Sequence, residues 1–245
     1  MSSLDETVRS FSMARIESDL RLLMEARVPT VKLVDRTFNY DATRARRIWS
    51  FILEHNVESR FHFEIGAHLL DVNCGAPGVD EPAALERAVY AVSGACTAPL
   101  VVDSSDPVAL ERALKAVDGK VLINSVNGER KSLERVLPLA RRYGAAVIGL
   151  TLDEEGIPET AQGRVTIAGR ILDAALAVGL PREDVIIDCL TLTVSAEQRR
   201  ALETLKALRL VRDQLGLGTA LGVSNISFGL PARPVLSAAF FAMAL

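Results

Sequence analysis

The chain of 245 residues is poor in the residues from which metal, disulfide and serine-hydrolase sites are built. Its three cysteines follow no CxxC or zinc-type spacing, and they are Cys74, Cys96 and Cys189. Its three histidines all lie within the first 70 residues, which leaves a serine nucleophile farther along the chain without a histidine base. We therefore expect no metal site and no disulfides, as in proteins of a reducing cytoplasm.

Aromatic residues and net charge are also scarce. Aromatics make up 5% of the chain and the formal net charge is −3, which excludes a basic or aromatic-rich surface for nucleic acid. No apolar run approaches the roughly 20 residues of a membrane span, and the polar start MSSLDETVRS is unlike a signal peptide. Apolar residues nevertheless make up 49%. The sequence thus predicts a cytoplasmic protein with a large core and with no nucleic-acid or membrane partner.

Short apolar runs, each ending in a small polar or acidic residue, recur along the chain. They are HLLDVN (68–73), PLVVDSS (99–105), KVLINSVN (120–127), AAVIGLTLD (145–153), DVIIDCLTL (184–192) and TALGVSN (219–225). Segments of helical periodicity separate them, at 81–95, 106–117, 132–144, 164–179 and 196–216. Runs this short and rich in β-branched residues are typical of parallel strands that are buried on both faces.

The spacing of these runs predicts the fold class. Their terminal residues are separated by 32, 21, 29, 35 and 37 residues, and they are Asp71, Asp103, Asn124, Asp153, Asp188 and Asn225. This is the pace of repeated strand–helix units. No GxGxxG turn follows any of the strands, so we expect a TIM-type (β/α) barrel of parallel strands rather than a doubly wound α/β sheet.

The first 65 residues are predicted to form a βα segment that contributes to the same barrel, ahead of a barrel domain at 66–245. Helical patterns at 12–28 and 41–56 flank a strand at 28–39, and RFHFEI (60–65) alternates like another strand. Too few residues separate RFHFEI from HLLDVN for a parallel crossover. We therefore expect RFHFEI either to continue into the next strand or to be displaced from the barrel, which is incomplete or irregular at this join.

Carboxylates and amides at the strand ends are the candidate binding residues, because the working site of such a barrel lies at the C-terminal ends of its strands. They are Asp71, Asn73, Asp103, Asn124, Asp188 and Asn225. One carboxylate accepts the paired N–H donors of a pterin (its 2-amino group and ring N3), and asparagine suits the remaining donors and acceptors. Helix capping explains any one of these residues equally well, but six around one rim favour a pterin site. Asp153 ranks lower, because DEEG (153–156) is also typical of a solvated turn.

Six longer motifs carry a resemblance to a known family. They are GAHLLDVNCGAPGVDE (66–81), PLVVDSS (99–105), VLINSVNGE (121–129), YGAAVIGLTLDEEGIPET (143–160), VIIDCLTLTV (185–194) and LGVSNISFGLPAR (221–233). Over about 66–245 the chain resembles the pterin-binding barrel of folate-dependent, cobalamin-linked methyltransferases, such as the methyltetrahydrofolate-binding domain of methionine synthase and the methyltetrahydrofolate:corrinoid methyltransferases. The resemblance implies a role in one-carbon metabolism and methionine biosynthesis.

The resemblance implies that the chain transfers the methyl group of methyltetrahydrofolate to a corrinoid (cobalamin). Its motifs assign the pterin edge to Asp103, Asn124 and Asp188. They place Asn225 near N5, which makes Asn225 and Asp188 the catalytic candidates. The same pocket would also be lined by Asp71 and Asn73. No cobalamin-binding DxHxxG pattern occurs in the chain, so the corrinoid is expected on a partner domain or protein.

Residues 9–70 resemble instead an internal stretch of a cobalamin-binding radical-SAM protein, through segments such as VKLVDRTFNYDATRARRIWSFILEHN (31–56). That family's CxxxCxxC motif occurs nowhere in the chain, so no iron–sulfur cluster is expected. GAHLLD (66–71) fits both resemblances and is the expected joint of a composite of two partial barrels, in which the methyltransferase family's first strand and last βα unit have no counterpart. Asp35, Arg36 and Asn39 also lie at a predicted strand end, where we favour loop and capping roles.

Two other functions stay open. A dihydropteroate synthase shares the barrel and the pterin pocket, but it would have a strand-end lysine and a Ser-Arg pair where GVSNISFG (222–229) stands. The third possibility is a non-catalytic, incomplete barrel scaffold with an exposed sheet edge. A homodimer that covers such an edge would be an intermediate case.

Overall fold

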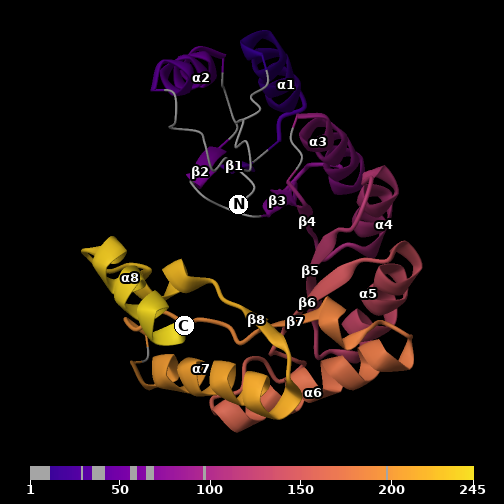
Figure 1. The fold of residues 1–245 in the computed structure, drawn as a ribbon, viewed down its shortest axis with the longest axis vertical. Coiled ribbons are helices and arrows are strands. Elements are labelled where there is room, and N and C mark those ends of the chain that lie inside the picture. Colours follow the sequence, from indigo (N-terminus) through magenta and orange to yellow (C-terminus); the bar gives the residue numbers. More distant parts are fainter. Residues whose placement is uncertain are drawn as a thin grey trace, which may run out of the picture. The chain divides into compact units, whose positions relative to one another are not determined.

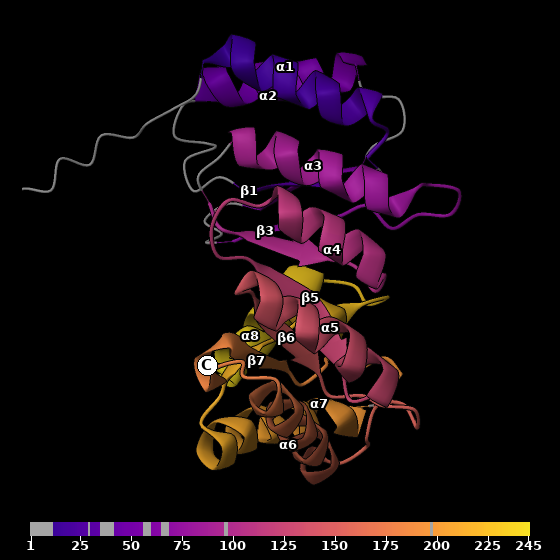
Figure 2. The same cartoon turned by 90° about the vertical axis from the view of Figure 1, so that its right-hand side faces the viewer.

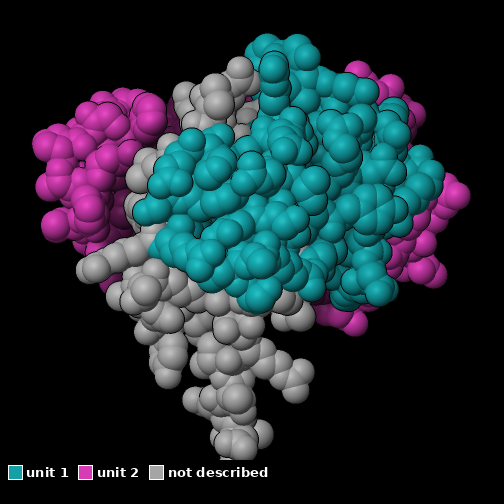
Figure 3. Space-filling model, turned by 90° about the horizontal axis from the view of Figure 1, so that it is seen from above, with its two compact units in different colours: residues 1–121 teal, residues 122–245 magenta. Residues whose placement is uncertain are grey.

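The computed structural model describes residues 12–28, 30–34, 42–55, 60–64, 69–95, 98–196 and 198–245. By its internal contacts the chain divides into two compact units, Met1–Val121 and Leu122–Leu245, which Figure 3 colours separately. The domain join predicted near residue 65 is not tested by this division and stays a prediction. The motif DRTFN (35–39), Asp41 and Cys96 lie outside the described residues.

The first unit alternates helices with short parallel strands. Its elements are α1 (Met13–Glu25), β1 (Thr30–Val34), α2 (Ala42–His55), β2 (Arg60–Glu64), β3 (Leu70–Asn73), α3 (Glu81–Ala95), β4 (Leu100–Asp103) and α4 (Pro107–Ala116). Strand β1 pairs with β2, and β3 pairs with β4, both in parallel. Helices α3 and α4 pack side by side along β3 and β4 (Figure 2).

Strand β2 settles how RFHFEI is used. It is separate from β3 and pairs with β1, in register from Thr30 with Arg60 to Val34 with Glu64. RFHFEI therefore does not form one strand with HLLDVN, whereas its displacement from the barrel stays a prediction. The residues between β2 and β3 are too few for a crossover between parallel neighbours.

The second unit contains four parallel strands in the order β5-β6-β7-β8. Its elements are β5 (Leu122–Asn127), α5 (Arg130–Tyr143), β6 (Ala146–Leu150), α6 (Ala161–Ala177), η1 (Arg182–Asp184), β7 (Val185–Asp188), α7 (Gln198–Leu210), η2 (Val211–Leu215), β8 (Gly218–Ala220), η3 (Val223–Ser227) and α8 (Arg233–Ala244). Helices α5 and α6 pack against the strands from one side, as Figure 1 shows.

Alternation along these strands determines which face meets the helices. In β6 and β7 every second residue is fully buried, including Val147, Val185 and Ile187. A Cβ on Gly149 would lie only 3.0 Å from the Ile171 side chain of α6, so this face of β6 packs directly on that helix. The alternate residues, among them Ile186 and Asp188, are less buried and lie on the face opposite the helices.

Glycine and aspartate mark several helix ends. Gly144 ends α5 and Gly216 ends η2, with φ of 65° and 62°, values that glycine adopts without the steric cost of a side chain. Asp106 caps α4 by accepting the Val108 N–H at 2.9 Å. Among the helices described here, none is both long and apolar enough to cross a bilayer.

Candidate functional site

In the first unit, the predicted residues of β3 and β4 lie together. Asn73 and Asp103 end their strands and are register partners, while Asp71 is paired with Val101 two residues earlier. Alternation along β3 places Asp71 and Asn73 on the same, half-buried face. The Asn73 Oδ1 accepts the Gly75 N–H at 3.0 Å, so part of its polar capacity serves the local turn.

In the second unit, the strand register places Asn124 and Asp188 on one face. Asn124 is paired with Ile148, which is paired with Ile186, and Asp188 lies two residues farther along β7. Both polar residues are half-buried and lie on the face opposite α5 and α6. Asn124 is the third residue of β5 rather than its end, because the strand continues through a register shift to Asn127. The prediction that Asn124 ends its strand was therefore wrong, since the bulge extends the pairing.

Asp188 ends β7, as predicted, and is set in a network of backbone hydrogen bonds. Its Oδ1 accepts the Leu190 N–H at 2.7 Å, and its carbonyl oxygen accepts the N–H and the hydroxyl of Thr151 at 3.1 and 3.2 Å. Burial raises the pKa of the Asp188 carboxyl, and the Leu190 N–H offsets part of that rise. A carboxyl with a raised pKa in a half-buried setting is a common property of binding and catalytic groups.

Asn225 lies in the 3₁₀ turn η3, beyond the end of β8 at Ala220. It was predicted to end a strand, and this is wrong, because Gly222 and the 3₁₀ turn end the pairing earlier. Its side chain is exposed and lies over Gly222, where an added Cβ would be 2.9 Å from the Asn225 Nδ2. The turn also keeps the Asn225 backbone in place, since the Asn225 N–H donates to the Gly222 carbonyl at 3.1 Å.

The segment that carries Asn225 is fastened to the loop that follows Asp188. The Val194 N–H donates to the Ile226 carbonyl at 3.0 Å, and the Thr193 hydroxyl donates to the Phe228 carbonyl at 2.9 Å. Hydrogen bonds therefore join the loop after β7 to the turn after β8. Of the predicted residues in this unit, the structure places Asn124 and Asp188 on one face and ties the Asn225 turn to the Asp188 loop.

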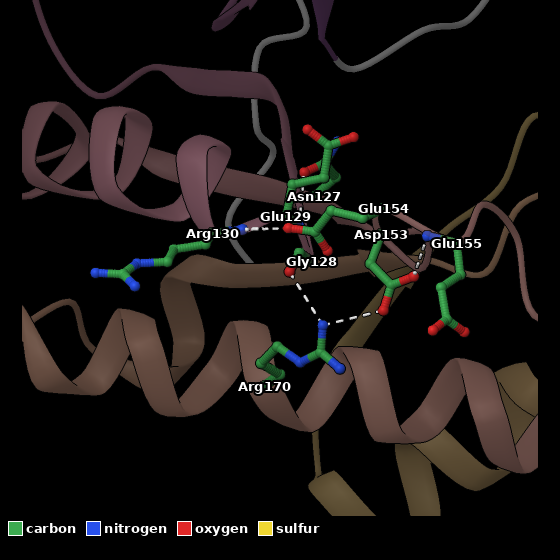
Figure 4. Close-up of polar contacts among 8 residues, drawn as sticks. All are labelled: Asn127, Gly128, Glu129, Arg130, Asp153, Glu154, Glu155 and Arg170. Atoms are coloured by element: carbon green, nitrogen blue, oxygen red, sulfur yellow. Dashed lines mark hydrogen bonds and ion pairs between the residues drawn. The ribbon is translucent and has the colours of Figure 1, made fainter.

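Asp153 has a structural role in the turn after β6. Its Oδ2 forms an ion pair with the Arg170 guanidinium of α6 at 3.0 Å, and its Oδ1 accepts the Glu155 N–H at 3.1 Å (Figure 4). The same guanidinium donates to the Gly128 carbonyl at 3.2 Å. Arg170 thus links the turn after β6 to the loop after β5, in agreement with the turn assigned to DEEG.

A cavity of about 740 Å³ lies beside this turn. Its lining includes Ile157, Pro158, Ile167, Arg170 and Arg200. Asn124, Asp188 and Asn225 do not line it. Asp153, the candidate that ranked lower, does line it, so the cavity is distinct only from the face that carries Asn124 and Asp188.

The two described cysteines are not poised as nucleophiles. Cys74 and Cys189 are fully buried, and burial raises the pKa of each thiol to about 12. Both are therefore protonated at neutral pH, and the thiol is the unreactive form. Within the parts of the chain that the structure describes, no three His, Cys, Asp or Glu side chains gather as a metal-binding group.

The sequence analysis missed Arg164. This residue of α6 is fully buried and bonds to the loop that follows Asp188. A signal was present, because Arg164 shares one helical face with the apolar residues Ile167, Ala168 and Ile171, at spacings of three, four and seven residues. A charged residue on a buried helix face requires a polar partner in the tertiary structure.

Comparison with known proteins gives a match to the family described as pterin binding enzyme over residues 57–245. The methionine synthase of Mycobacterium tuberculosis is 37% identical over 188 residues, which cover 71% of this chain and 16% of that protein. The methylcorrinoid:tetrahydrofolate methyltransferase of Eubacterium limosum is 29% identical over 185 residues, covering 74% of this chain and 68% of that protein. The chain thus spans about a sixth of the methionine synthase.

Solved structures of dihydropteroate synthases share the fold. The enzyme of Thermus thermophilus superposes with a TM-score of 0.58 at 22% identity, covering 89% of this chain and 82% of that one. The enzyme of Yersinia pestis superposes with a TM-score of 0.54 at 14% identity, covering 89% and 84%. The likeness confirms the predicted class, a TIM-type α/β fold of parallel strands. It bears on the fold alone.

Proposed function

Because the chain belongs to the pterin-binding enzyme family, we propose that it binds methyltetrahydrofolate and transfers the methyl group to a corrinoid carried by another domain or protein. The observation that carries the proposal is the placement of Asn124 and Asp188 on the face of the second unit opposite the helices. The names of the similar proteins support the choice of methyl transfer within the family. The N-terminal segment resembling a radical-SAM protein stays a prediction.

Asp188 is the proposed anchor of the pterin. Its carboxylate has one oxygen bonded to the Leu190 N–H, and the remaining lone pairs are available to the 2-amino and N3–H donors of the ring. The amide of Asn124, which both donates and accepts, would meet the neighbouring carbonyl and ring nitrogen. The pterin-binding roles expected of Asp71, Asn73 and Asp103, which lie in the first unit, stay predictions.

Asn225 is the proposed catalytic donor. The methyl group leaves N5 more easily when that nitrogen gains positive character. A hydrogen-bonding group that stabilises the charge developing on N5 in the transition state therefore lowers the barrier to transfer. The exposed amide of Asn225 is free to meet a ligand from its position over Gly222. The corrinoid, when bound on the partner, supplies the nucleophile that accepts the methyl group.

Replacing Asn225 by alanine should slow methyl transfer about fivefold while changing the Kd for methyltetrahydrofolate by less than about threefold, since one hydrogen bond worth roughly 1 kcal/mol is strongest in the transition state. Single-turnover transfer to added cob(I)alamin and calorimetric titration measure the two quantities. Ser224→Ala, in the same turn, is the matched control. An equal loss of affinity and of rate would place Asn225 in ground-state binding instead.

Gly222→Ala should reproduce the Asn225→Ala phenotype without removing the amide. The new Cβ would lie 2.9 Å from the Asn225 Nδ2, which forces this flexible side chain to swing away. Because only the end of an exposed side chain moves, the free energy of unfolding should change by less than about 0.5 kcal/mol. Transfer rates and thermal melts of the variant are the measurements. Normal transfer in Gly222→Ala would mean that the observed amide position is not the working one.

The overall proposal is tested by calorimetric titration of the whole chain with methyltetrahydrofolate and by transfer to cob(I)alamin. Binding in the micromolar range together with transfer supports it, and the absence of heat at high micromolar ligand overturns it. The structural likeness to dihydropteroate synthases makes condensation of a pterin with p-aminobenzoate the informative counter-assay. Condensation without methyl transfer would favour that second function.

A further inference from the structure

Arg164 is a fully buried cation whose hydrogen-bond partners are neutral. It lies on α6, with an exposed fraction of 0%. Its Nε donates to the Pro158 carbonyl at 3.0 Å, and its Nη1 donates to the carbonyls of Cys189 and Leu190 at 2.9 and 3.1 Å and to the Thr204 hydroxyl at 2.7 Å. Burying a guanidinium is costly, and these hydrogen bonds offset part of that cost.

Two of those contacts fix the residues that directly follow Asp188. Leu190 has φ of +59°, a left-handed conformation that costs a residue with a Cβ roughly 1–2 kcal/mol. This conformation directs the Leu190 N–H to the Asp188 Oδ1, at 2.7 Å. The orientation of the Asp188 carboxylate therefore depends on the left-handed conformation of Leu190. Arg164 bonds to the carbonyl of that same residue.

We propose that Arg164 is a positioning residue for pterin binding, which holds the loop after β7 in its left-handed conformation and thereby fixes the Asp188 carboxylate toward the ligand. The proposal rests on the proposed function, since it gives Asp188 the role of pterin anchor. Arg164 acts through the backbone of Cys189 and Leu190 and does not contact the ligand. The rigid fork of the guanidinium suits this task, because it donates to several carbonyls at fixed angles.

Thr204 of α7 completes the clamp. Its hydroxyl oxygen accepts from Arg164 at 2.7 Å and lies 3.1 Å from the Leu190 carbonyl and 3.0 Å from the Arg200 carbonyl, to which it donates. Thr204 is also fully buried. The loop after Asp188 is thus held between α6 and α7, and loss of the guanidinium removes the central element of this arrangement.

Arg164→Met keeps the apolar part of the side chain and removes the donors. We expect the Kd for methyltetrahydrofolate to rise about tenfold, which corresponds to roughly 1.4 kcal/mol. We also expect the pH midpoint of binding to move upward, because the pKa of Asp188 rises further once the Leu190 N–H no longer offsets the effect of burial. The neighbouring Cys189 thiol, with a pKa of about 12, does not titrate in this range. Calorimetric titration between pH 5 and 8 measures both effects.

Ile171→Ala is the matched control, because Ile171 is also fully buried on α6 but packs on Gly149 rather than on the loop after Asp188. It should lower stability while leaving the Kd and its pH midpoint unchanged. Arg164→Lys should recover only part of the affinity, since an ammonium lacks the fixed fork. Equal affinity and an equal pH midpoint in wild type and Arg164→Met would overturn the inference, whereas a wild type that does not bind would overturn the proposed function instead.

A rescue experiment separates positioning from general stability. Glycine adopts positive φ about as readily as negative φ, so Arg164→Met/Leu190→Gly should regain much of the lost affinity and return the pH midpoint toward the wild-type value. If Arg164→Met does not fold, Thr204→Val provides a milder version of the same loss, with Leu190→Gly again as the rescue. No rescue in a folded double variant would contradict the role assigned to the loop.

Discussion

Asp188→Asn is expected to raise the Kd for methyltetrahydrofolate about a hundredfold. In the proposed complex the carboxylate would accept two N–H donors of the pterin, whereas an amide would present one oxygen and one NH₂ group that faces a donor. Losing one charge-assisted hydrogen bond and opposing a second donor costs about 3 kcal/mol, which is about a hundredfold in affinity. Calorimetric titration of the two proteins side by side measures it.

The pH dependence follows from the raised pKa of Asp188. Only the ionised form accepts both donors, so the affinity of the wild type should weaken as the pH falls through that raised pKa. In Asp188→Asn this dependence should disappear, while any ionisation of the ligand itself persists in both proteins. A variant whose affinity keeps the wild-type pH profile would show that another group carries the titration.

The pH dependence of the stability of the unliganded protein should have the opposite sign to that of the affinity. A carboxyl with a higher pKa in the folded chain than in the unfolded chain binds protons more tightly when folded. Its contribution to the free energy of unfolding therefore falls as the pH rises from about 4 through the raised value. Asp188→Asn should consequently be at least as stable as the wild type at pH 7, which urea denaturation would test.

Asp153→Asn is the control for these experiments. Asp153 is a carboxylate of the same unit, but its oxygens are used by Arg170 and by the Glu155 N–H. Loss of the Asp153 carboxylate should change the Kd for methyltetrahydrofolate by less than about threefold. The partly exposed ion pair with Arg170 is worth less than about 1 kcal/mol. A large loss of affinity in Asp153→Asn would move the site toward the turn after β6.

Gly128→Ala is expected to destabilise the second unit by about 3 kcal/mol, at the upper end of what overpacking costs. An added Cβ would lie 2.6 Å from the Ile167 Cγ2 and 3.0 Å from the Leu152 carbonyl oxygen. Neither neighbour yields easily, because Ile167 is buried and β-branched and the Leu152 carbonyl accepts the Gly128 N–H at 2.8 Å. The clash therefore separates the loop after β5 from α6.

Gly169→Ala provides the matched control for Gly128→Ala. Gly169 lies within α6, and nothing is within 4 Å of its virtual Cβ. Alanine should stabilise the helix there by about 0.5–1 kcal/mol, so the two substitutions have opposite signs. Urea denaturation of both variants is the measurement. A Gly128→Ala protein as stable as the wild type would mean that Ile167 repacks at no cost.

Much of the fold was predictable because its signals are local. The helix predicted at 81–95 has those bounds in the structure, and Asp188, Asn73 and Asp103 end their strands as expected. Asn124 and Asn225 departed from the prediction, since a register shift in β5 and a 3₁₀ turn after β8 are not marked by periodicity. Asp71 and Asp153 do not end strands either, because β3 continues to Asn73 and β6 ends at Leu150. The convergence of all six predicted residues on one ligand stays a prediction.

Periodic apolar runs were enough to predict parallel strands alternating with helices, because the burial of short strands depends on nearby residues alone. The contacts that hold the loop after Asp188 were decided only by tertiary packing. Arg164 reaches Leu190 across 26 residues of sequence, and Thr193 reaches Phe228 across 35. Such contacts depend on how α6 and the loops lie against the strands, and this arrangement cannot be predicted from local periodicity.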